Sequence, residues 1–262
     1  MSSKKNGFAS RTFLLKEMVA RDVASRYAGS GLGIVWAFAL PILWMLLYTG
    51  VFSVVLRVPT PAGFASFPEF LMAGLLPWMA IQEGIARSAS ALTDNASMVK
   101  KTVFPVELLV LSVVLAAVVN EVIALAVYAI YVALIGHLSL PWLLLVLPAL
   151  VLQVTLTFGI GCIAATLTAF VRDTVHAIGI LLTMILYTTP IIYPASLVPE
   201  RLRWIPAANP FAHLVEWYRL AFTLHRAPEP ASVLFLTIVS SATALVGLAL
   251  FQRARPHFAD VV

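Results

Sequence analysis

Three polar residues interrupt apolar stretches at positions where ionisable groups are costly. Asn120 and Glu121 lie in the apolar run 106–135, and Gln153 lies in the run 140–171. At 1.5 Å of rise per helical residue, all three fall near the middle of a membrane that both runs cross. An uncompensated charge there is expensive, so Glu121 is expected to be neutral or paired. The group either lines a transport path or holds two helices together by hydrogen bonds, and we favour the second interpretation.

Basic residues gather just before the first long apolar run. In segment 11–27 apolar residues recur at every fourth position, with basic and polar residues between them, namely Arg11, Lys16, Arg21 and Arg26 beside Leu15, Val19, Val23 and Tyr27. This pattern is typical of a helix that lies in the membrane surface with its basic face toward anionic headgroups. Leu32 and Gly33 follow in a glycine-rich stretch that predicts a bend. The sequence therefore places basic groups at headgroup depth beside a turn.

Aromatic residues suggest a second kind of contact. They lie mostly toward the ends of apolar runs, at Trp36, Trp44, Tyr48, Tyr187 and Tyr193. Tryptophan and tyrosine are enriched at membrane interfaces, and this is the interpretation we favour. The alternative is that their rings stack on the apolar faces of sugars that pass through the membrane.

Catalytic and nucleotide-binding motifs are not found in the sequence. Gly29, Gly31 and Gly33 resemble a glycine-rich loop, but no strand precedes them and no Lys-Ser/Thr pair follows, so we expect a hinge there. The five histidines lack metal-ligand spacing, and no G-x-S-x-G is present. We therefore expect no enzyme activity, metal or other cofactor on this chain. Glu83 and Arg87 are spaced i, i+4 and predict an intrahelical ion pair.

The composition indicates an integral membrane protein. Of 262 residues, 61% are hydrophobic and only 11% are charged, whereas soluble domains carry roughly 25% charged residues. A soluble fold could not hide so much apolar surface. The single cysteine, Cys162, lies in an apolar stretch and is expected to be a small buried hydrophobic residue.

The apolar runs predict six membrane-spanning helices. A helix needs roughly 20 apolar residues to cross the bilayer core, and the candidate runs are 31–56, 67–92, 106–135, 140–171, 176–193 and 233–251. The fold class is therefore all-α integral membrane, with an N-terminal amphipathic interfacial helix. We divide the chain into a tail with that helix (1–30), a transmembrane domain (31–252) and a C-terminal tail (253–262).

The distribution of Lys and Arg predicts the orientation. Six basic residues precede the first run, Lys100 and Lys101 lie between the second and third, and Arg253 and Arg255 follow the last. This bias places both termini in the cytoplasm. The loop between the fifth and sixth runs would lie outside despite its four arginines. Its apolar residues have roughly helical spacing, which predicts short helices that dip into the interface.

Several motifs together resemble a known family. They occur in order along nearly the whole chain, as Arg21-Asp22, Arg26-Tyr27, Gly29 to Gly33, Trp36 and Pro41; Asn95, Lys100-Lys101 and Phe104-Pro105; Arg172-Asp173, Pro190 and Tyr193; Asn209-Pro210 and Arg219; and Phe251, Phe258 and Asp260. In this the chain resembles the ABC-2 type permeases of polysaccharide exporters, which serve O-antigen, teichoic acid and capsule. The motifs look closer to the O-antigen and teichoic-type permeases.

The resemblance implies a half-transporter in the bacterial inner membrane. Two copies would pair, and two separate ATP-binding subunits, which hold the ATP and Mg²⁺, would dock on the cytoplasmic side. The segment around Asn95, Lys100, Lys101 and Phe104 would contact them. The substrate would be a glycan on undecaprenyl pyrophosphate or another lipid anchor, with Arg21 and Arg26 near Leu32-Gly33 meeting its phosphate. Membrane lipids are further expected partners, and nucleic acid is not. The loop after the fifth run would form periplasmic re-entrant helices.

Three other functions remain as alternatives. An efflux permease of the same superfamily would export a small apolar compound. A proton-coupled secondary transporter would use Glu121 as its proton site, but the chain has no inverted repeat and few charged residues in the membrane. The third alternative is a membrane scaffold without transport.

Overall fold

The chain forms a bundle of helices that run side by side. The computed structural model describes residues 2–100 and 104–262, with side chains from residue 11 onward, and all regular structure in these residues is helical. The longer helices are α1 (Ser2–Tyr27), α2 (Val35–Tyr48), α3 (Phe67–Ser90), α5 (Glu107–Leu134), α7 (Val146–Phe170), α8 (Thr174–Thr188), α10 (Pro210–Arg219) and α11 (Pro230–Val261). Short elements are α4 (Ala96–Val99), α6 (Leu140–Leu143), α9 (Trp204–Ala208), the 3-10 turns Ala195–Leu197 and Glu200–Leu202, and the π-helical turns Thr49–Val55 and Leu220–Leu224.

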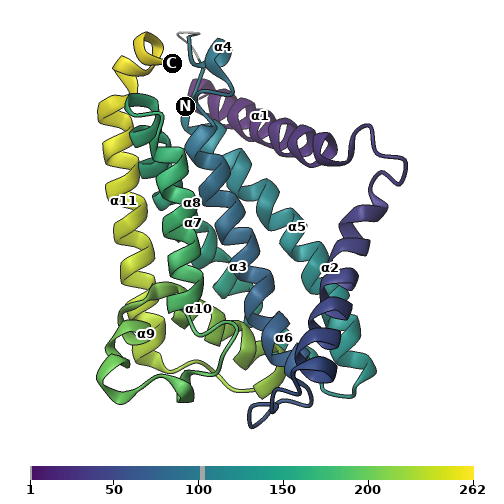
Figure 1. Cartoon of the computed structure of the whole chain (residues 1–262). Coiled ribbons are helices and arrows are strands. Elements are labelled where there is room, and N and C mark those ends of the chain that lie inside the picture. The colour runs from purple at the N-terminus through teal and green to yellow at the C-terminus, as the bar shows by residue number, and fades with distance from the viewer. Residues whose placement is uncertain (1, 101–103) are drawn as a thin grey trace.

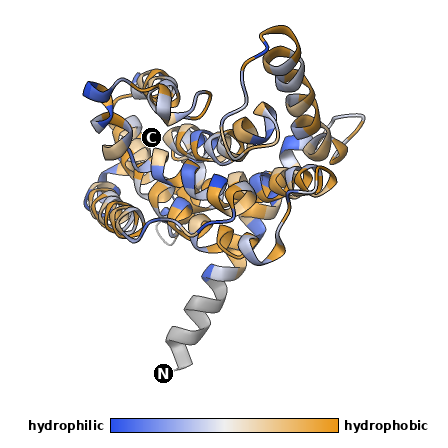
Figure 2. Ribbon diagram, turned by 90° about the horizontal axis from the view of Figure 1, so that it is seen from below, coloured by the Kyte–Doolittle hydropathy of each residue, from blue (hydrophilic) through white to orange (hydrophobic). Residues whose placement is uncertain are grey.

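Four stretches among the described residues are long and apolar enough to cross a membrane. They are Val35–Val55, Glu107–Leu134, Leu140–Phe170 and Pro230–Val261. Apolar residues also dominate the helices around the rim of the bundle when it is viewed along its length (Figure 2). Many large apolar side chains remain exposed on α2, α8 and α11. Lipid is the environment that suits this surface, so the all-helical membrane fold predicted from the sequence agrees with the structure.

Helix α3 is the most buried element and lies between α5, α7, α8 and α10. Ser66 caps its start by accepting a hydrogen bond from the main-chain N–H of Glu69. Its apolar side chains form one core with α5, α7 and α10, in which Trp78, Tyr128 and Tyr218 are fully buried. Helix α3 therefore contacts protein on nearly every side.

Helices α7 and α11 approach each other closely through small residues. A Cβ atom added to Gly159 would lie 2.6 Å from main-chain atoms of Thr243 and Ala244, and one added to Gly247 would overlap the carbonyl oxygen of Gly159. Small residues let helix backbones approach in a membrane, where packing rather than the hydrophobic effect drives association. The cost of glycine inside a helix is therefore offset here by close contact.

Helix α1 lies across one end of the bundle, and the same end holds α4 and both termini (Figure 1). Its apolar stripe is half-buried because α1 packs along α5. A turn then leads into α2, which stands at the edge of the bundle (Figure 1). Residues 253–262, expected to be a separate tail, continue α11 without a break as far as Val261, so that boundary lies inside a helix.

The opposite end of the bundle carries α6, α9 and α10 (Figure 1). Asn209 begins α10, since its side chain accepts a hydrogen bond from the N–H of Phe211 and donates one to Thr189. Phe211, Leu214 and Trp217 on α10 are buried against the bundle, whereas Leu197 and Trp204 in the preceding segment are exposed. The short helices predicted between the last two apolar runs are therefore present.

Candidate functional site

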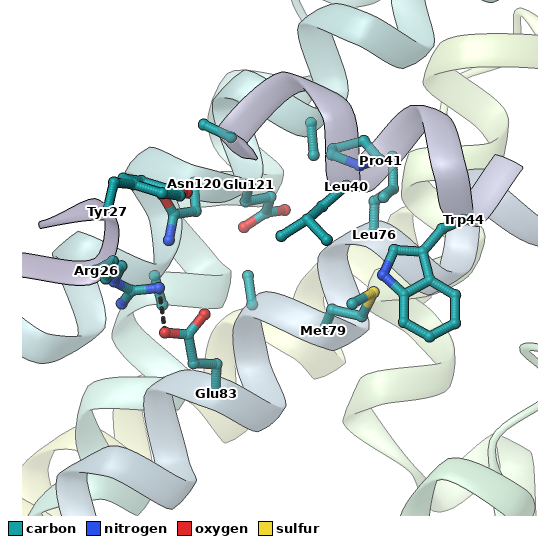
Figure 3. Close-up of a pocket in the computed structure, with 14 residues that line it drawn as sticks. Arg26, Tyr27, Leu40, Pro41, Trp44, Leu76, Met79, Glu83, Asn120 and Glu121 are labelled. Atoms are coloured by element: carbon teal, nitrogen blue, oxygen red, sulfur yellow. Dashed lines mark hydrogen bonds and ion pairs between the residues drawn. The ribbon is translucent and has the colours of Figure 1, made fainter. Parts of the chain in front are cut away.

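A cavity of about 360 Å³ lies between α1, α2, α3 and α5. Its wall is mostly apolar, with Ala37, Leu40, Pro41, Trp44, Leu76, Met79, Ala80, Ala117 and Ala124. Five polar residues complete the lining: Arg26 and Tyr27 from the end of α1, Glu83 from α3, and Asn120 and Glu121 from α5 (Figure 3). An apolar cavity of this size with a few convergent polar groups is the usual form of a small-molecule site.

Four charged residues join α1 to α3 beside this cavity. Asp22 accepts hydrogen bonds from both terminal nitrogens of Arg87, one of them at 2.8 Å, and one from Arg26 at 3.4 Å. Arg26 forms a further ion pair with Glu83, drawn in Figure 3. Glu83 and Arg87 also contact each other at 3.4 Å, which confirms the predicted intrahelical pair. Glu83 and Arg87 nevertheless make their shorter contacts with residues of α1. The i, i+4 spacing could not predict these contacts between helices.

The cluster shifts the titration of Asp22. Burial alone would raise the pKa of this carboxyl, but the hydrogen bonds and positive charges of Arg87 and Arg26 outweigh burial and hold the pKa below its ordinary value of 3.8. Asp22 is therefore ionised at neutral pH.

Arg21, the other arginine predicted to meet a headgroup, is exposed and lines a second cavity with Asp22 and Arg87.

The predicted bend between the interfacial helix and the first apolar run is present. Gly29 and Gly33 have φ angles of +78° and +51°, in the left-handed region that glycine adopts without strain. The N–H of Gly33 donates to the carbonyl of Ser30 at 3.1 Å, which closes the turn. Leu32 is 54% exposed and makes no contact with the cavity. The two glycines thus allow α2 to leave α1 and form the outer wall of the cavity.

A buried polar chain connects three helices in the middle of the bundle. The hydroxyl of Tyr218 on α10 donates to Oε1 of Gln153 at 2.7 Å, and Nε2 of Gln153 donates to Oε2 of Glu121. This confirms that Glu121 and Gln153 are neighbours, as their estimated depths predict. Asn120 instead accepts a hydrogen bond from Tyr27 at 3.3 Å. Oε1 of Glu121 is buried without a hydrogen-bond partner among the described residues, although its residue lines the cavity.

The aromatic residues considered for sugar stacking fall into two groups. Trp44 and Tyr48 stack with ring centroids 5.6 Å apart on α2, with Trp36 half-buried two turns earlier. Tyr187 and Tyr193 line a different cavity beyond the end of α8, where the hydroxyl of Tyr193 donates to the carbonyl of Tyr187 at 2.9 Å. The sequence pattern did not separate these groups.

The segment expected to contact ATP-binding subunits surrounds α4. Asn95 precedes this helix, and its side chain donates to the carbonyl of Ala91 at 2.9 Å. Lys100 is exposed at the end of α4. The carbonyl of Phe104 accepts a hydrogen bond from Arg255 at 3.2 Å, which ties this segment to the end of α11. Lys101 lies outside the described residues.

Arg219 is a buried arginine for which the sequence predicts no specific role beyond its place after Asn209-Pro210. Its side chain is 3% exposed, and its guanidinium donates to the main-chain carbonyls of Pro190 and Ile191 at 2.8 Å and of Phe70 at 3.3 Å. It also lies over the ring of Phe70, 3.8 Å from the centroid. The sequence feature that could have predicted this role is an arginine in an apolar helix that begins with Asn-Pro.

Among the described residues, no group of three or more His, Cys, Asp or Glu side chains could hold a metal ion.

Comparison with known proteins assigns these features to a family. Residues 14–223, which include the second half of the interfacial helix, the cavity and the buried polar chain, match the ABC-2 type transporter family. The chain belongs to this family. It is accordingly a multi-pass membrane subunit of a transporter and does not itself carry out catalysis.

Curated ABC-2 relatives match over almost their full length. The chain is 32% identical to the O-antigen export system permease protein RfbA of Myxococcus xanthus, with 95% of each chain covered. It is 31% identical to the protein of the same name from Klebsiella pneumoniae, again with 95% of each chain covered. Identity to the polysialic acid transport protein KpsM of Escherichia coli is 24%, over 95% of this chain and 96% of the relative.

Proposed function

We propose that this chain is the permease subunit of an ATP-driven exporter that moves a lipid-linked polysaccharide, most closely an O-antigen, across the bacterial inner membrane. The observation that carries the proposal is the 32% identity to an O-antigen export permease over 95% of both chains. The lower identity to a polysialic acid transport protein favours O-antigen over capsule as the substrate class. Undecaprenyl pyrophosphate is the proposed lipid anchor.

The proposed permease crosses the membrane six times. Helix α3 adds to the four long apolar stretches, since its 24 residues span about 36 Å. Helix α8 is apolar but has only 15 residues, about 22 Å, so a sixth crossing requires the segment after Thr188. The burial of Phe211, Leu214 and Trp217 supports α9 and α10 as re-entrant helices that fold back into the bundle.

Both termini are proposed to lie in the cytoplasm. Support comes from their shared end of the bundle (Figure 1) and from the basic residues near that end. The orientation can be tested by single-cysteine labelling in a Cys162→Ala background. A membrane-impermeant thiol reagent added to intact spheroplasts should modify Arg201→Cys, an exposed position at the opposite end, but should modify Asp260→Cys only after lysis. The reverse pattern would contradict the orientation.

The proposed transporter contains two copies of this chain and two ATP-binding subunits that hold ATP and Mg²⁺. The exposed apolar surfaces of α2 and α8 support pairing of two copies. A second argument for pairing is that a single copy is too small to enclose a polymer-wide channel. The α4 segment, with Asn95, Lys100, Lys101 and Phe104, is the proposed contact with the ATP-binding subunits. Mass measurement in nanodiscs tests the assembly, and a stable active monomer would contradict it.

The lipid phosphate is proposed to meet the α1 end of the protein. Arg21 is exposed and can contact a phosphate directly, whereas Arg26 is already paired with Asp22 and Glu83. Leu32 and Gly33 form the adjacent bend. The glycan would pass the aromatic residues Trp36, Trp44 and Tyr48 near one end, and Tyr187 and Tyr193 near the other.

Deletion with complementation tests the proposed function. Loss of surface polysaccharide after deletion, with lipid-linked polymer accumulating inside the cell and restoration by the intact gene, is the expected result. Unchanged surface polysaccharide together with increased sensitivity to small apolar compounds would instead identify an efflux permease. Transport that continues without ATP but stops when the proton gradient collapses would identify a secondary transporter. No transport phenotype would favour a scaffold.

A further inference from the structure

We propose that the cavity between α1, α2, α3 and α5 binds an uncharged amphipathic alcohol, with its hydroxyl groups at Arg26 and Glu121 and its apolar chain against Trp44. The ligand is a membrane lipid with a hydroxyl headgroup and one apolar chain, as in a monoacylglycerol. The site shares Arg26 and Trp44 with the proposed substrate path, and it goes beyond the proposed function in assigning an uncharged lipid to that wall, whichever molecule the transporter exports.

The shape and lining of the cavity fit a single chain rather than a polymer. Its volume of about 360 Å³ is small compared with a polysaccharide segment and lies at the lower end of the range for small ligands. Nine of its fourteen lining residues are apolar. Alanines contribute four of these, at Ala37, Ala80, Ala117 and Ala124, and they leave the space that a chain would fill.

Two polar atoms of the lining are buried without a hydrogen-bond partner among the described residues. They are Nε of Arg26, which donates, and Oε1 of Glu121. Glu121 is 3% exposed, and its carboxyl group points into the cavity (Figure 3). A buried polar atom left unpaired is costly, and native proteins rarely leave one without a reason. Hydroxyl groups suit both atoms, because a hydroxyl can donate or accept.

The charges around the cavity favour an uncharged ligand. Arg26 and Arg87 are matched by Asp22 and Glu83, and all four are held in mutual ion pairs. An anionic or cationic headgroup would have to break one of these pairs or enter without a counter-charge, and both are costly in a poorly solvated site. A fatty acid or a phospholipid is therefore a poorer match than an alcohol.

The polar and apolar residues are separated within the cavity. Arg26, Tyr27, Glu83 and Asn120 lie together on one side, whereas Trp44, Leu76 and Met79 lie on the other (Figure 3). The end of α1, the proposed interfacial helix, contributes Arg26 and Tyr27 to the polar side, and α3 and α5 contribute Glu83 and Asn120. A bound alcohol would thus have its headgroup at the side of the cavity next to the end of α1 and its chain along α2.

Fluorescence quenching tests the proposal at a defined position. The intact chain in nanodiscs is titrated with a dibrominated monoacylglycerol, and bromine quenches tryptophan only at close range. We expect saturable quenching, of which the Trp44 share is lost in Trp44→Phe. The dibrominated fatty acid and its methyl ester should bind at least about tenfold more weakly, because one brings a charge and the other lacks hydroxyl groups. Equal quenching by all three probes would overturn the proposal.

Two alanine variants on α5 provide a matched comparison. Ala124 lines the cavity and is half-buried, whereas Ala126 is exposed and does not line it. Ala124→Leu should fill the space and abolish saturable quenching, and Ala126→Leu should leave it unchanged. Native mass spectrometry should detect one retained monoacylglycerol per chain in the wild type and none in Ala124→Leu. Retention in Ala124→Leu, or none in the wild type, would show that the cavity holds water or bulk lipid only.

Discussion

The carboxylate of Asp22 on α1 accepts hydrogen bonds from both terminal nitrogens of Arg87 on α3, 65 residues away. This contact fixes the interfacial helix to the most buried helix of the bundle, at the end that holds α4 (Figure 1). Two parallel hydrogen bonds between a guanidinium and a carboxylate set orientation as well as energy. A displacement of α1 would therefore be passed to α3 through this pair.

Replacing Asp22 should loosen that attachment. We expect Asp22→Asn to lower the free energy of unfolding by about 1 kcal/mol, a value kept small because Arg87 is 37% exposed. Thermal unfolding in detergent measures the effect, and Glu17→Gln, an exposed acid on the same helix, is the control. Since the pKa of Asp22 is below 3.8 in the fold, the stabilisation is present above that pH and is lost as the pH falls further. A difference between variant and wild type that does not shrink as the pH is lowered below 3.8 would contradict this account.

The buried polar chain gives a prediction about Glu121. If this residue serves as a structural hydrogen-bond acceptor, Glu121→Gln should preserve stability and export, because the amide can still accept from Gln153. Glu121→Leu should lower stability by about 0.6–2 kcal/mol. Tyr218→Phe should cost about 1 kcal/mol, since it removes the donor to Oε1 of Gln153. A stable Glu121→Gln variant that no longer transports would instead indicate a proton site.

Charge reversal at α4 tests the proposed contact with ATP-binding subunits. Lys100→Glu should insert normally but weaken stimulation of the partner's ATPase by the polysaccharide, because the exposed lysine lies at the end of α4. Arg253→Glu, another exposed basic residue near the same end, is the matched control and should have a smaller effect. Unchanged coupling in Lys100→Glu would mean that this charge serves only to orient the chain in the membrane.

Hydropathy predicted most of the fold. Every apolar run of the sequence corresponds to a helix or a pair of consecutive helices, with ends that differ by at most five residues except at the end of α11, which continues to Val261. The reason is that each run must satisfy its backbone hydrogen bonds internally if it is to lie in lipid, so length and apolarity alone identify it. The spacing of polar residues along two runs also predicted that Glu121 and Gln153 are neighbours.

Contacts between distant segments were not predictable in the same way. Glu83 and Arg87 satisfy the local rule for an ion pair, yet each also pairs with a residue of α1, because α1 packs along α5 and brings its side chains within reach of α3. Arg219 resembled one more basic residue of an outer loop. Its guanidinium is buried because it donates to main-chain carbonyls in the segment just after α8 ends. No periodicity in the sequence predicts that these carbonyls bond to a side chain.

The close crossing of α7 and α11 should tolerate no side chain. We expect Gly247→Ala to lower the melting temperature, because its Cβ would overlap the carbonyl oxygen of Gly159 and force two backbones apart. Gly179→Ala is the control: it lies on α8 with nothing within 4 Å of an added Cβ, so it should be neutral or stabilise by roughly 0.5–1 kcal/mol. Equal effects of the two substitutions would show that helix propensity, and not packing, governs both sites.

Arg219 should fix the start of the loop after α8. Its guanidinium donates to three carbonyl oxygens, on Phe70, Pro190 and Ile191, through three different nitrogens, a planar fork that the compact ammonium of lysine does not reproduce. Arg219→Met would leave these oxygens without that donor in an apolar site, and we expect it to lower the free energy of unfolding by about 3 kcal/mol. Arg203→Met, at an exposed arginine of the same loop, should have no measurable effect.

The lysine variant separates the two interactions of Arg219. If its main contribution is the positive charge over the ring of Phe70, at 3.8 Å, Arg219→Lys should retain nearly wild-type stability. If the fork of hydrogen bonds matters more, as we expect, Arg219→Lys should resemble Arg219→Met, and limited proteolysis should cut segment 190–209 faster in both variants. Because α10 carries both Arg219 and Tyr218, release of this anchor should also weaken the hydrogen bond from Tyr218 to Gln153, so the effects of Arg219→Lys and Tyr218→Phe should be less than additive.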